Sequence, residues 1–361
     1  MLPRTDDFMY ACRIDAEPLD RYRKGGYHPI LLGSSLSDGR YKILHKLRWG
    51  GYSTVWAARD RRSQSLGTYV AVKICVSERE CDIGQRELNV LKELTSKHAG
   101  SRHVRLVDNF DLDGPNGKHQ CLVFELLGTS LPDVMETRFS DGRHPGEIAK
   151  AITKQALLGL GFLHQHKIAH GAFALNAMDN VPEREFMETL ERPEIKHVYR
   201  SDGKDLESGI PRYIVRAART SSWPLSKMIK IVDFGESFLQ QITPYTLRTP
   251  LPVRAPEVIF RDRLDYRMDL WSLGCMELTN KPLPERWLGL WEAMSGEVAA
   301  EDSRIRLQEW LEEMYFDGQR KADLTGQGIV RLGHIIQKLL RFEPSARASA
   351  REILNDPWFR D

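Results

Sequence analysis

One short stretch, Ile231-Val232-Asp233-Phe234-Gly235-Glu236, limits what this chain can fold into. A β-branched run there ends at an acid, an aromatic residue and a glycine, so the pattern predicts a buried strand that ends at a carboxylate. Two other motifs lie on either side of this stretch in the sequence: Val70-Ala71-Val72-Lys73 is upstream, and Arg254-Ala255-Pro256-Glu257 is downstream. We therefore expect Asp233 at the C-terminal end of a buried strand.

Composition narrows the classes of protein that fit. The 361 residues are 41% hydrophobic and 28% charged, which is typical of a soluble globular protein with one large two-lobed domain or two ordinary ones. The net charge is only +2, so no overall field favours nucleic acid or membrane as a direct partner. No apolar stretch approaches the ~20 residues of a membrane span, and the N-terminus lacks the apolar run of a signal peptide.

The cysteines indicate a reducing compartment. They show no CxxC spacing and their number is odd, so we expect free thiols and a location in the cytoplasm and nucleus. These residues are Cys12, Cys75, Cys81, Cys121 and Cys275.

A glycine-centred hairpin follows a polar extension of about 38 residues, which we expect to pack on the first lobe. The hairpin turns at Trp49-Gly50-Gly51-Tyr52. Backbone N–H groups in such a turn can lie over a phosphate chain, although most Gly-Gly hairpins are merely hairpins. Arg48 stands beside the turn and either crowds a nucleotide or adds a cation next to it.

A lysine and a glutamate lie on the next two elements. Lys73 sits in a predicted strand, 69–76, among apolar neighbours, where burial without an anion is costly; the alternative is an edge-strand lysine that reaches solvent. Residues 82–97 have helical periodicity, and Glu87 shares the inward side of that helix with Leu91. An acid on an apolar face needs a cation, so we expect Glu87 to pair with Lys73, unless it is a solvated rim side chain.

The remaining elements complete two lobes. Two strands, 104–107 and 121–125, flank a predicted hairpin loop over 111–118 and give the first lobe five strands and one helix. The charged stretch 182–227 reads as an insertion. Helices are expected at 149–166, 266–278, 332–340 and 350–354.

These motifs together resemble eukaryotic protein kinases and, within them, the SR-protein kinases (SRPK) of the fungal type. The resemblance covers about residue 20 to 361. It is carried by Gly25-Gly26-Tyr27-His28-Pro29, Gly50-Gly51-Tyr52-Ser53-Thr54-Val55-Trp56, Leu122-Val123-Phe124-Glu125-Leu126-Leu127-Gly128, Asp233-Phe234-Gly235-Glu236, Thr249-Pro250-Leu251-Pro252-Val253-Arg254-Ala255-Pro256-Glu257, Asp265-Tyr266-Arg267-Met268-Asp269-Leu270-Trp271-Ser272 and Leu283-Pro284-Glu285-Arg286-Trp287.

The resemblance implies an α+β, bilobal protein kinase fold. After an N-terminal extension, 1–38, it implies a kinase domain over 39–361. This domain would comprise a small β-rich N-lobe with one helix, 39–127, and a larger α-helical C-lobe, 128–361, with the insertion near 182–227.

The resemblance also implies ATP and Mg²⁺ as cofactors. It implies a monomeric enzyme whose substrates are the serines of Arg/Ser-rich splicing-type proteins, and it implies roles for individual residues. Lys73, oriented by Glu87, would hold the α- and β-phosphates, and Asp233 would be the third catalytic residue. Metal would be held by Asp233 and Asn176, and Glu257, Asp269 and Arg347 would be structural. The implied nucleotide-binding residues are Leu47, Gly50, Gly51, Ser53, Val55, Ala71, Lys73, and the backbone of Glu125 and Leu127.

The catalytic loop departs from the family pattern. Ala172 occupies the place of the catalytic aspartate, and Gly171 replaces the usual arginine. Asn176 can hold metal only if the loop is one residue short. Loss of a general base costs roughly 10²–10⁴-fold in rate. Asp179, just beyond the loop, is a conceivable substitute base.

Substrate docking is also in question, because the helix after Gly274-Cys275-Met276 is shorter than in the family. The alternative to an active kinase is therefore a pseudokinase that binds ATP or partners without efficient transfer. A small-molecule phosphotransferase of the aminoglycoside kinase type is a third reading, but the Ala-Pro-Glu triplet at 255–257 argues against it.

Overall fold

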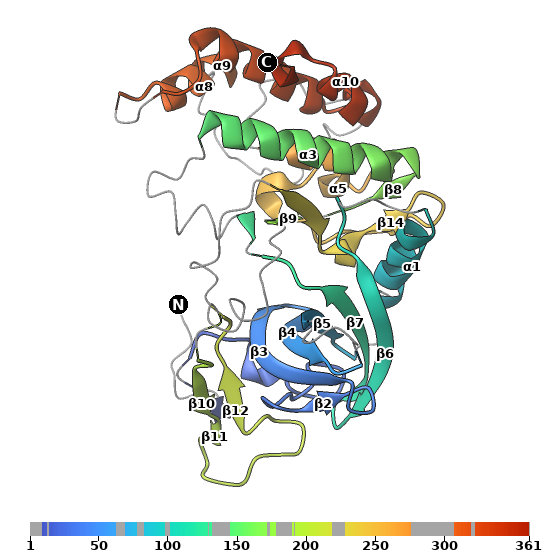
Figure 1. Cartoon of the computed structure of the whole chain (residues 1–361), viewed down its shortest axis with the longest axis vertical. Coiled ribbons are helices and arrows are strands. Elements are labelled where there is room, and N and C mark those ends of the chain that lie inside the picture. The colour runs from blue at the N-terminus through green and yellow to red at the C-terminus, as the bar shows by residue number, and fades with distance from the viewer. Residues whose placement is uncertain are drawn as a thin grey trace. The chain divides into compact units, whose positions relative to one another are not determined.

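The computed structural model divides into two compact units (Figure 1). The first contains 1–88, 104–129 and 178–225, and the second contains 89–103, 130–177 and 226–361. For residue 83 and for 174–177 the structure describes the backbone alone. The described residues are 9–12, 14–62, 69–77, 83–97, 102–128, 130–131, 145–171, 174–177, 190, 192–218, 228–275, 307–318 and 322–360.

The first unit is built on a six-stranded antiparallel sheet, where the sequence predicted five strands. The additional strand is β2, which comes from the N-terminal extension. Helix α1 (Ile83–Ser96) follows the central strand β5 and spans the division between the units. In spatial order the strands are β2 (Ser35–Leu36), β3 (Tyr41–Gly50), β4 (Ser53–Asp60), β5 (Tyr69–Cys75), β7 (Gly117–Glu125) and β6 (Leu106–Gly114).

The two faces of β5 differ as the alternation of its residues predicts. Val70, Val72 and Ile74 are at most 1% exposed and belong to one apolar core. That core also contains Ile30 from the extension and Val215 from the insertion. Ile30 of the extension and Val215 of the insertion therefore pack on the face of the sheet opposite Lys73.

The expected hairpin loop over 111–118 is wrong, because β6 and β7 continue through most of it. Asp111 pairs with Gln120 and Asp113 with Lys118, and only Pro115 and Asn116 remain between the strands. The segment is rich in Asp, Gly, Pro and Asn, which are typical of turns and so suggested a loop. Only Pro115 and Asn116 are needed to make the turn.

The insertion has strands of its own. The strand β10 (Ile195–His197) pairs antiparallel with β12 (Tyr213–Val215) (Figure 1). The strand between them, β11 (Tyr199–Arg200), pairs with β1 (Tyr10–Ala11) of the extension. Extension and insertion share a second core. Its buried members are Tyr22, Tyr27, Val198, Ile210 and Ile214.

The second unit is mainly helical. Its long helix α3 (Gly146–Gln165) packs against α10 (Ala350–Leu354) and buries residues at the spacing of one helix face, namely Ile152, Ala156, Leu157, Leu160 and Leu163. Helix α9 (Gly326–Leu339) packs against α6 (Met268–Gly274) and α8 (Leu307–Tyr315). Two short antiparallel pairs complete the unit, β13 (Ile229–Val232) with β9 (Ala174–Ala177), and β14 (Phe238–Leu239) with β8 (Ile168–Ala169).

The predicted fold class, α+β with a β-rich first part and a helical second part, is confirmed. In the described part of the chain, no helix is long and apolar enough to cross a membrane. The described cysteines, Cys12, Cys75, Cys121 and Cys275, are free thiols, and Cys81 lies outside the described residues.

Candidate functional site

Lys73 and Glu87 form an ion pair in the first unit. The Lys73 ammonium donates to both carboxylate oxygens of Glu87, at 2.9 and 2.8 Å. Lys73 stands on β5, between β4 and β7, so it is not an edge-strand lysine. The glutamate side chain is 1% exposed, so it is not a solvated rim residue, while the lysine keeps 13% of its surface exposed. A buried carboxylate thus fixes a cation on the sheet face opposite the core.

The glycine turn joins β3 to β4, with Gly50 paired to Ser53. A Cβ atom added at Gly50 or Gly51 would meet no atom within 4 Å, and neither residue has a left-handed φ. The packing of the protein therefore does not require glycine at either position. A bare backbone facing open space is what the close approach of a ligand requires.

The other predicted nucleotide-binding residues all lie in the first unit. Val55 is directly paired with Lys73, and Ala71 with Phe124 of the neighbouring strand. At the end of β7, the Glu125 N–H donates to the carbonyl of Arg105 at 3.1 Å, and a Glu125 carboxylate oxygen accepts from the Arg105 N–H at 2.7 Å. Leu127 is the second residue after the end of the strand.

Sequence reasoning missed a contribution from the insertion. Leu47 and Leu126 pack in one apolar cluster with Ala57 and with two insertion residues, Leu190 and Ala218. Leu190 is 8% exposed, although the charged stretch around it gave no signal of burial. The apolar residues Phe186 and Met187, four and three positions before Leu190, were the available indication in the sequence.

In the second unit, Asp233 lies where the sequence predicted it, directly after the buried strand β13. Its φ of 65° and ψ of 66° are left-handed, which is uncommon for a residue with a side chain and is concentrated at functional sites. Phe234 is 1% exposed and packs edge-on against His170, with ring centroids 4.7 Å apart. A His170 ring nitrogen lies 2.9 Å from the Val232 carbonyl. These contacts fix the backbone that carries the exposed Asp233 side chain.

Asp269 holds the start of the predicted catalytic loop. One carboxylate oxygen accepts from the Gly171 N–H at 2.9 Å, and the other accepts from the His170 N–H at 2.8 Å. The His164 ring lies 3.1 Å from the second oxygen. Ala172 and Asp179 lie outside the described residues. For Asn176, only the backbone is described, and it pairs with Lys230.

Gly171 is required by this backbone. Its φ is +83°, and a Cβ atom there would lie 2.4 Å from the carbonyl oxygen of Glu236. The Thr249 hydroxyl also donates to the Gly171 carbonyl at 2.6 Å. An arginine at this position would not fit the structure of this chain without a backbone shift.

Glu257 and Arg347 form a fully buried bidentate pair. Both hydrogen bonds measure 2.6 Å, and the side chains are 1% and 0% exposed. The guanidinium also donates to three backbone carbonyls and lies over the Trp271 ring. The pair ties α5 (Pro256–Ile259) to the segment that precedes α10.

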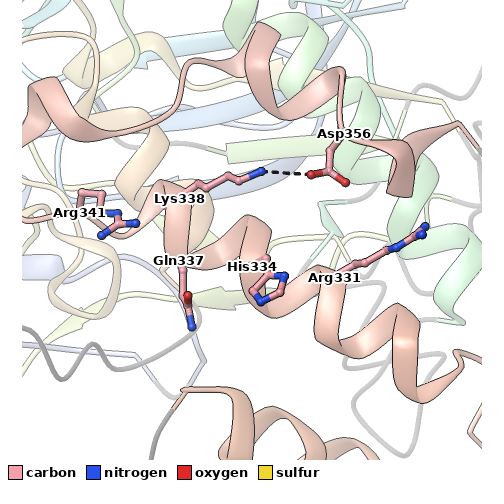
Figure 2. A pocket seen from close by; sticks show the side chains of 6 residues that line it. All are labelled: Arg331, His334, Gln337, Lys338, Arg341 and Asp356. Atoms are coloured by element: carbon pink, nitrogen blue, oxygen red, sulfur yellow. Dashed lines mark hydrogen bonds and ion pairs between the residues drawn. The ribbon is translucent and has the colours of Figure 1, made fainter.

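Within the described ranges, no group of three or more His, Cys, Asp or Glu side chains could hold a metal on its own. Asp233 carries a carboxylate, which is the kind of oxygen ligand that Mg²⁺ prefers. A cavity of about 380 Å³ along α9 contains none of the predicted site residues (Figure 2). It is lined by Arg331, His334, Gln337, Lys338, Arg341 and Asp356.

Comparison with known proteins agrees with this geometry. The sequence profile of the protein kinase domain matches residues 224–359. A serine/threonine-protein kinase SRPK of Physarum polycephalum is 33% identical over 285 aligned positions, covering 72% of this chain and 64% of the relative. The chain thus spans just under two thirds of the length of that relative.

Two fungal proteins are also similar. A serine/threonine protein kinase of Aspergillus fumigatus is 28% identical over 395 aligned positions, covering 96% of this chain and 91% of the relative. The protein kinase dsk1 of Schizosaccharomyces pombe is 38% identical over 151 residues, 41% of this chain and 28% of the relative.

Fold, site geometry and these similarities define a protein kinase. Within that class the chain belongs to the SR-protein kinase family.

Proposed function

We propose that this protein binds ATP with Mg²⁺ and transfers the terminal phosphate to serines of Arg/Ser-rich proteins. The observation that carries the proposal is the Lys73–Glu87 pair. A lysine that is held by a buried carboxylate and keeps part of its own side chain exposed is suited to bind phosphate oxygens, and phosphoryl transfer depends mainly on such positioning and charge stabilisation.

Other residues in each unit support nucleotide binding. Gly50 and Gly51 leave open space beside their backbone, where phosphate could approach. Leu47, Val55 and Ala71 would contact the adenine ring, with the backbone of Glu125 and Leu127 reading its edge and Ser53 near the phosphates. Asp233 would hold Mg²⁺, which neutralises charge on the phosphates when bound.

A second candidate function is that of a pseudokinase, and the identity of residue 172 favours it. Ala172 offers no carboxylate to orient the substrate hydroxyl or accept its proton. In that case ATP binding persists, turnover is low, and the protein acts through its partners. Both candidate functions use the same nucleotide-binding residues, and they differ in the rate of phosphate transfer.

A paired experiment separates them. Thermal stability of the full chain is measured with and without Mg·ATP, and phosphate transfer to an Arg-Ser repeat peptide is measured in parallel. A shift with turnover at an ordinary kinase rate, roughly 1–100 s⁻¹, supports the active enzyme. A shift without turnover supports the pseudokinase, and no shift contradicts nucleotide binding. We further propose that the protein is monomeric, which the mass of the full chain in solution would test. We also propose that it works in the cytoplasm and nucleus, which imaging of a fluorescently tagged full chain would test.

A further inference from the structure

The N-terminal extension holds the glycine turn directly. A terminal guanidinium nitrogen of Arg21 donates to the carbonyl of Gly51 at 2.8 Å, and the Tyr27 hydroxyl donates to the carbonyl of Gly50, also at 2.8 Å. Two consecutive peptide carbonyls of the turn are therefore bonded to two side chains from outside the hairpin.

Two glycines bring Arg21 and Tyr27 together. A Cβ atom at Gly26 would lie 1.9 Å from the Arg21 carbonyl oxygen, and Gly25 has a φ of +86°. The tight loop lets the Tyr27 N–H donate to that same carbonyl at 2.9 Å. The Arg21 guanidinium then lies 5.4 Å from the centre of the Tyr27 ring and 5.9 Å from that of Tyr52 in the turn. The Gly-Gly-Tyr motif before the kinase domain thus has a structural purpose that the kinase site does not explain.

The loop is anchored from behind. Glu17 accepts two hydrogen bonds of 2.6 Å from the ammonium of Lys46 on β3, and these side chains are 0% and 1% exposed. The Tyr22 hydroxyl donates to the same carboxylate. From the other side, the Asn116 amide donates to the Tyr27 carbonyl at 2.7 Å. Residues 17–27 are therefore fixed at both ends, and Arg21 and Tyr27 extend from a rigid support.

We propose that residues 17–27 form a brace that sets the backbone of the glycine turn for phosphate binding. In this brace Arg21 and Tyr27 are positioning residues, and the proposal rests on the nucleotide-binding function proposed above. Glycine has more backbone freedom than other residues, so ordering Gly50-Gly51 around a phosphate chain costs conformational entropy. Fixing two of its carbonyls beforehand lowers that cost and increases affinity for the phosphates.

The alternative is that the brace only stabilises the first unit. Tyr213 provides a matched control, because its hydroxyl accepts a hydrogen bond of 2.9 Å from the Leu32 N–H of the same extension. In the described hydrogen bonds Tyr213 makes no contact with the glycine turn. Tyr27→Phe and Tyr213→Phe each remove one hydroxyl and keep the ring.

The experiment uses the full chain and its Tyr27→Phe, Arg21→Gln and Tyr213→Phe variants. Hydrogen exchange is followed in the peptide covering residues 48–54, and affinities are measured for Mg·ATP and for adenosine, which has no phosphate. We expect Tyr27→Phe and Arg21→Gln to speed exchange in this peptide and to weaken Mg·ATP binding by about threefold to tenfold, the effect of one hydrogen bond. Adenosine affinity should change less than about twofold, and Tyr213→Phe should change none of these readings beyond that range.

Each contrary result has a separate meaning. Unchanged exchange over 48–54 in both brace variants overturns the brace. Faster exchange with unchanged Mg·ATP affinity, or an equal loss for Mg·ATP and adenosine, overturns its role in phosphate binding. If the wild-type chain binds neither ligand, the proposed function fails together with the phosphate role, while the exchange measurement still decides whether the brace exists.

Discussion

Arg347 and Glu257 are joined by two hydrogen bonds of 2.6 Å with no exposed surface on the arginine side chain. Removal of one partner leaves the other charge buried and unpaired, so we expect Arg347→Met to lower the free energy of unfolding by roughly 3–5 kcal/mol. Urea denaturation monitored by fluorescence measures this loss.

A control and a double variant make this prediction specific. Lys338 pairs with Asp356 at 3.2 Å with 49% of its side chain exposed, so Lys338→Met should cost at most about 1 kcal/mol. Arg347→Met combined with Glu257→Leu should be more stable than Arg347→Met alone, because no unpaired charge remains. A double variant no better than the single one would contradict the explanation.

Asp269 should stabilise the start of the catalytic loop through its two backbone hydrogen bonds. Asp269→Asn keeps the shape but turns one acceptor into a donor that faces the N–H of His170 or Gly171. We expect a loss of roughly 1–3 kcal/mol and faster hydrogen exchange over 168–171. Glu93→Gln, at an exposed i,i+4 pair with Lys97, should cost less than about 1 kcal/mol. Equal losses for the two variants would refute the special role of Asp269.

Stability of the first unit should fall in mild acid because of His28. Burial lowers the pKa of this imidazole to about 4, and nearby His119 acts in the same direction. Since the pKa is lowered in the folded state, the unfolded chain binds a proton between about pH 6.5 and 4 that the folded chain does not. The stabilisation is therefore complete above pH 6.5 and is lost as the pH falls towards 4.

For this histidine we expect a loss of roughly 1–2 kcal/mol between pH 7 and pH 5. His28→Gln should reduce the pH dependence of the unfolding free energy by that amount. An unchanged pH dependence in His28→Gln would show that another group is responsible.

Restoring the base tests whether residue 172 limits transfer. Ala172→Asp should raise phosphate transfer to an Arg-Ser repeat peptide by roughly 10²–10⁴-fold if the rest of the site functions. Ala172→Asn, similar in size but without a carboxylate, should not. No gain in Ala172→Asp would place the defect elsewhere, and the shortened segment after Cys275 is the first candidate.

The sequence was informative where a local pattern carried the signal. Alternation in β5 predicted which face is buried, and an acid on the apolar side of a helix predicted the partner of Lys73. The family and the α+β class followed from ordered motifs and are confirmed. The roles of the individual site residues stay predictions.

Contacts between distant segments were not predictable in the same way. The pairing of β1 with β11 joins residues about 190 positions apart, and neither segment has the length or alternation of an ordinary strand. The hydrogen bonds from Arg21 and Tyr27 to the glycine turn are also contacts between separate segments that no local sequence pattern predicts. Gly171 was interpreted as the loss of an arginine, but its close approach to Glu236 depends on tertiary packing that a motif does not encode.

Isothermal titration of the full chain with Mg·ATP tests the central claim most directly. We expect a dissociation constant in the range of about 1 μM to 1 mM, as for typical enzyme substrates. Lys73→Met should bind at least about tenfold more weakly, since it loses a charge-assisted contact to phosphate. Lys118→Met, at an exposed lysine of the β6–β7 hairpin, should bind like the wild type. No binding by the wild-type chain, or equal binding by Lys73→Met, would contradict the account.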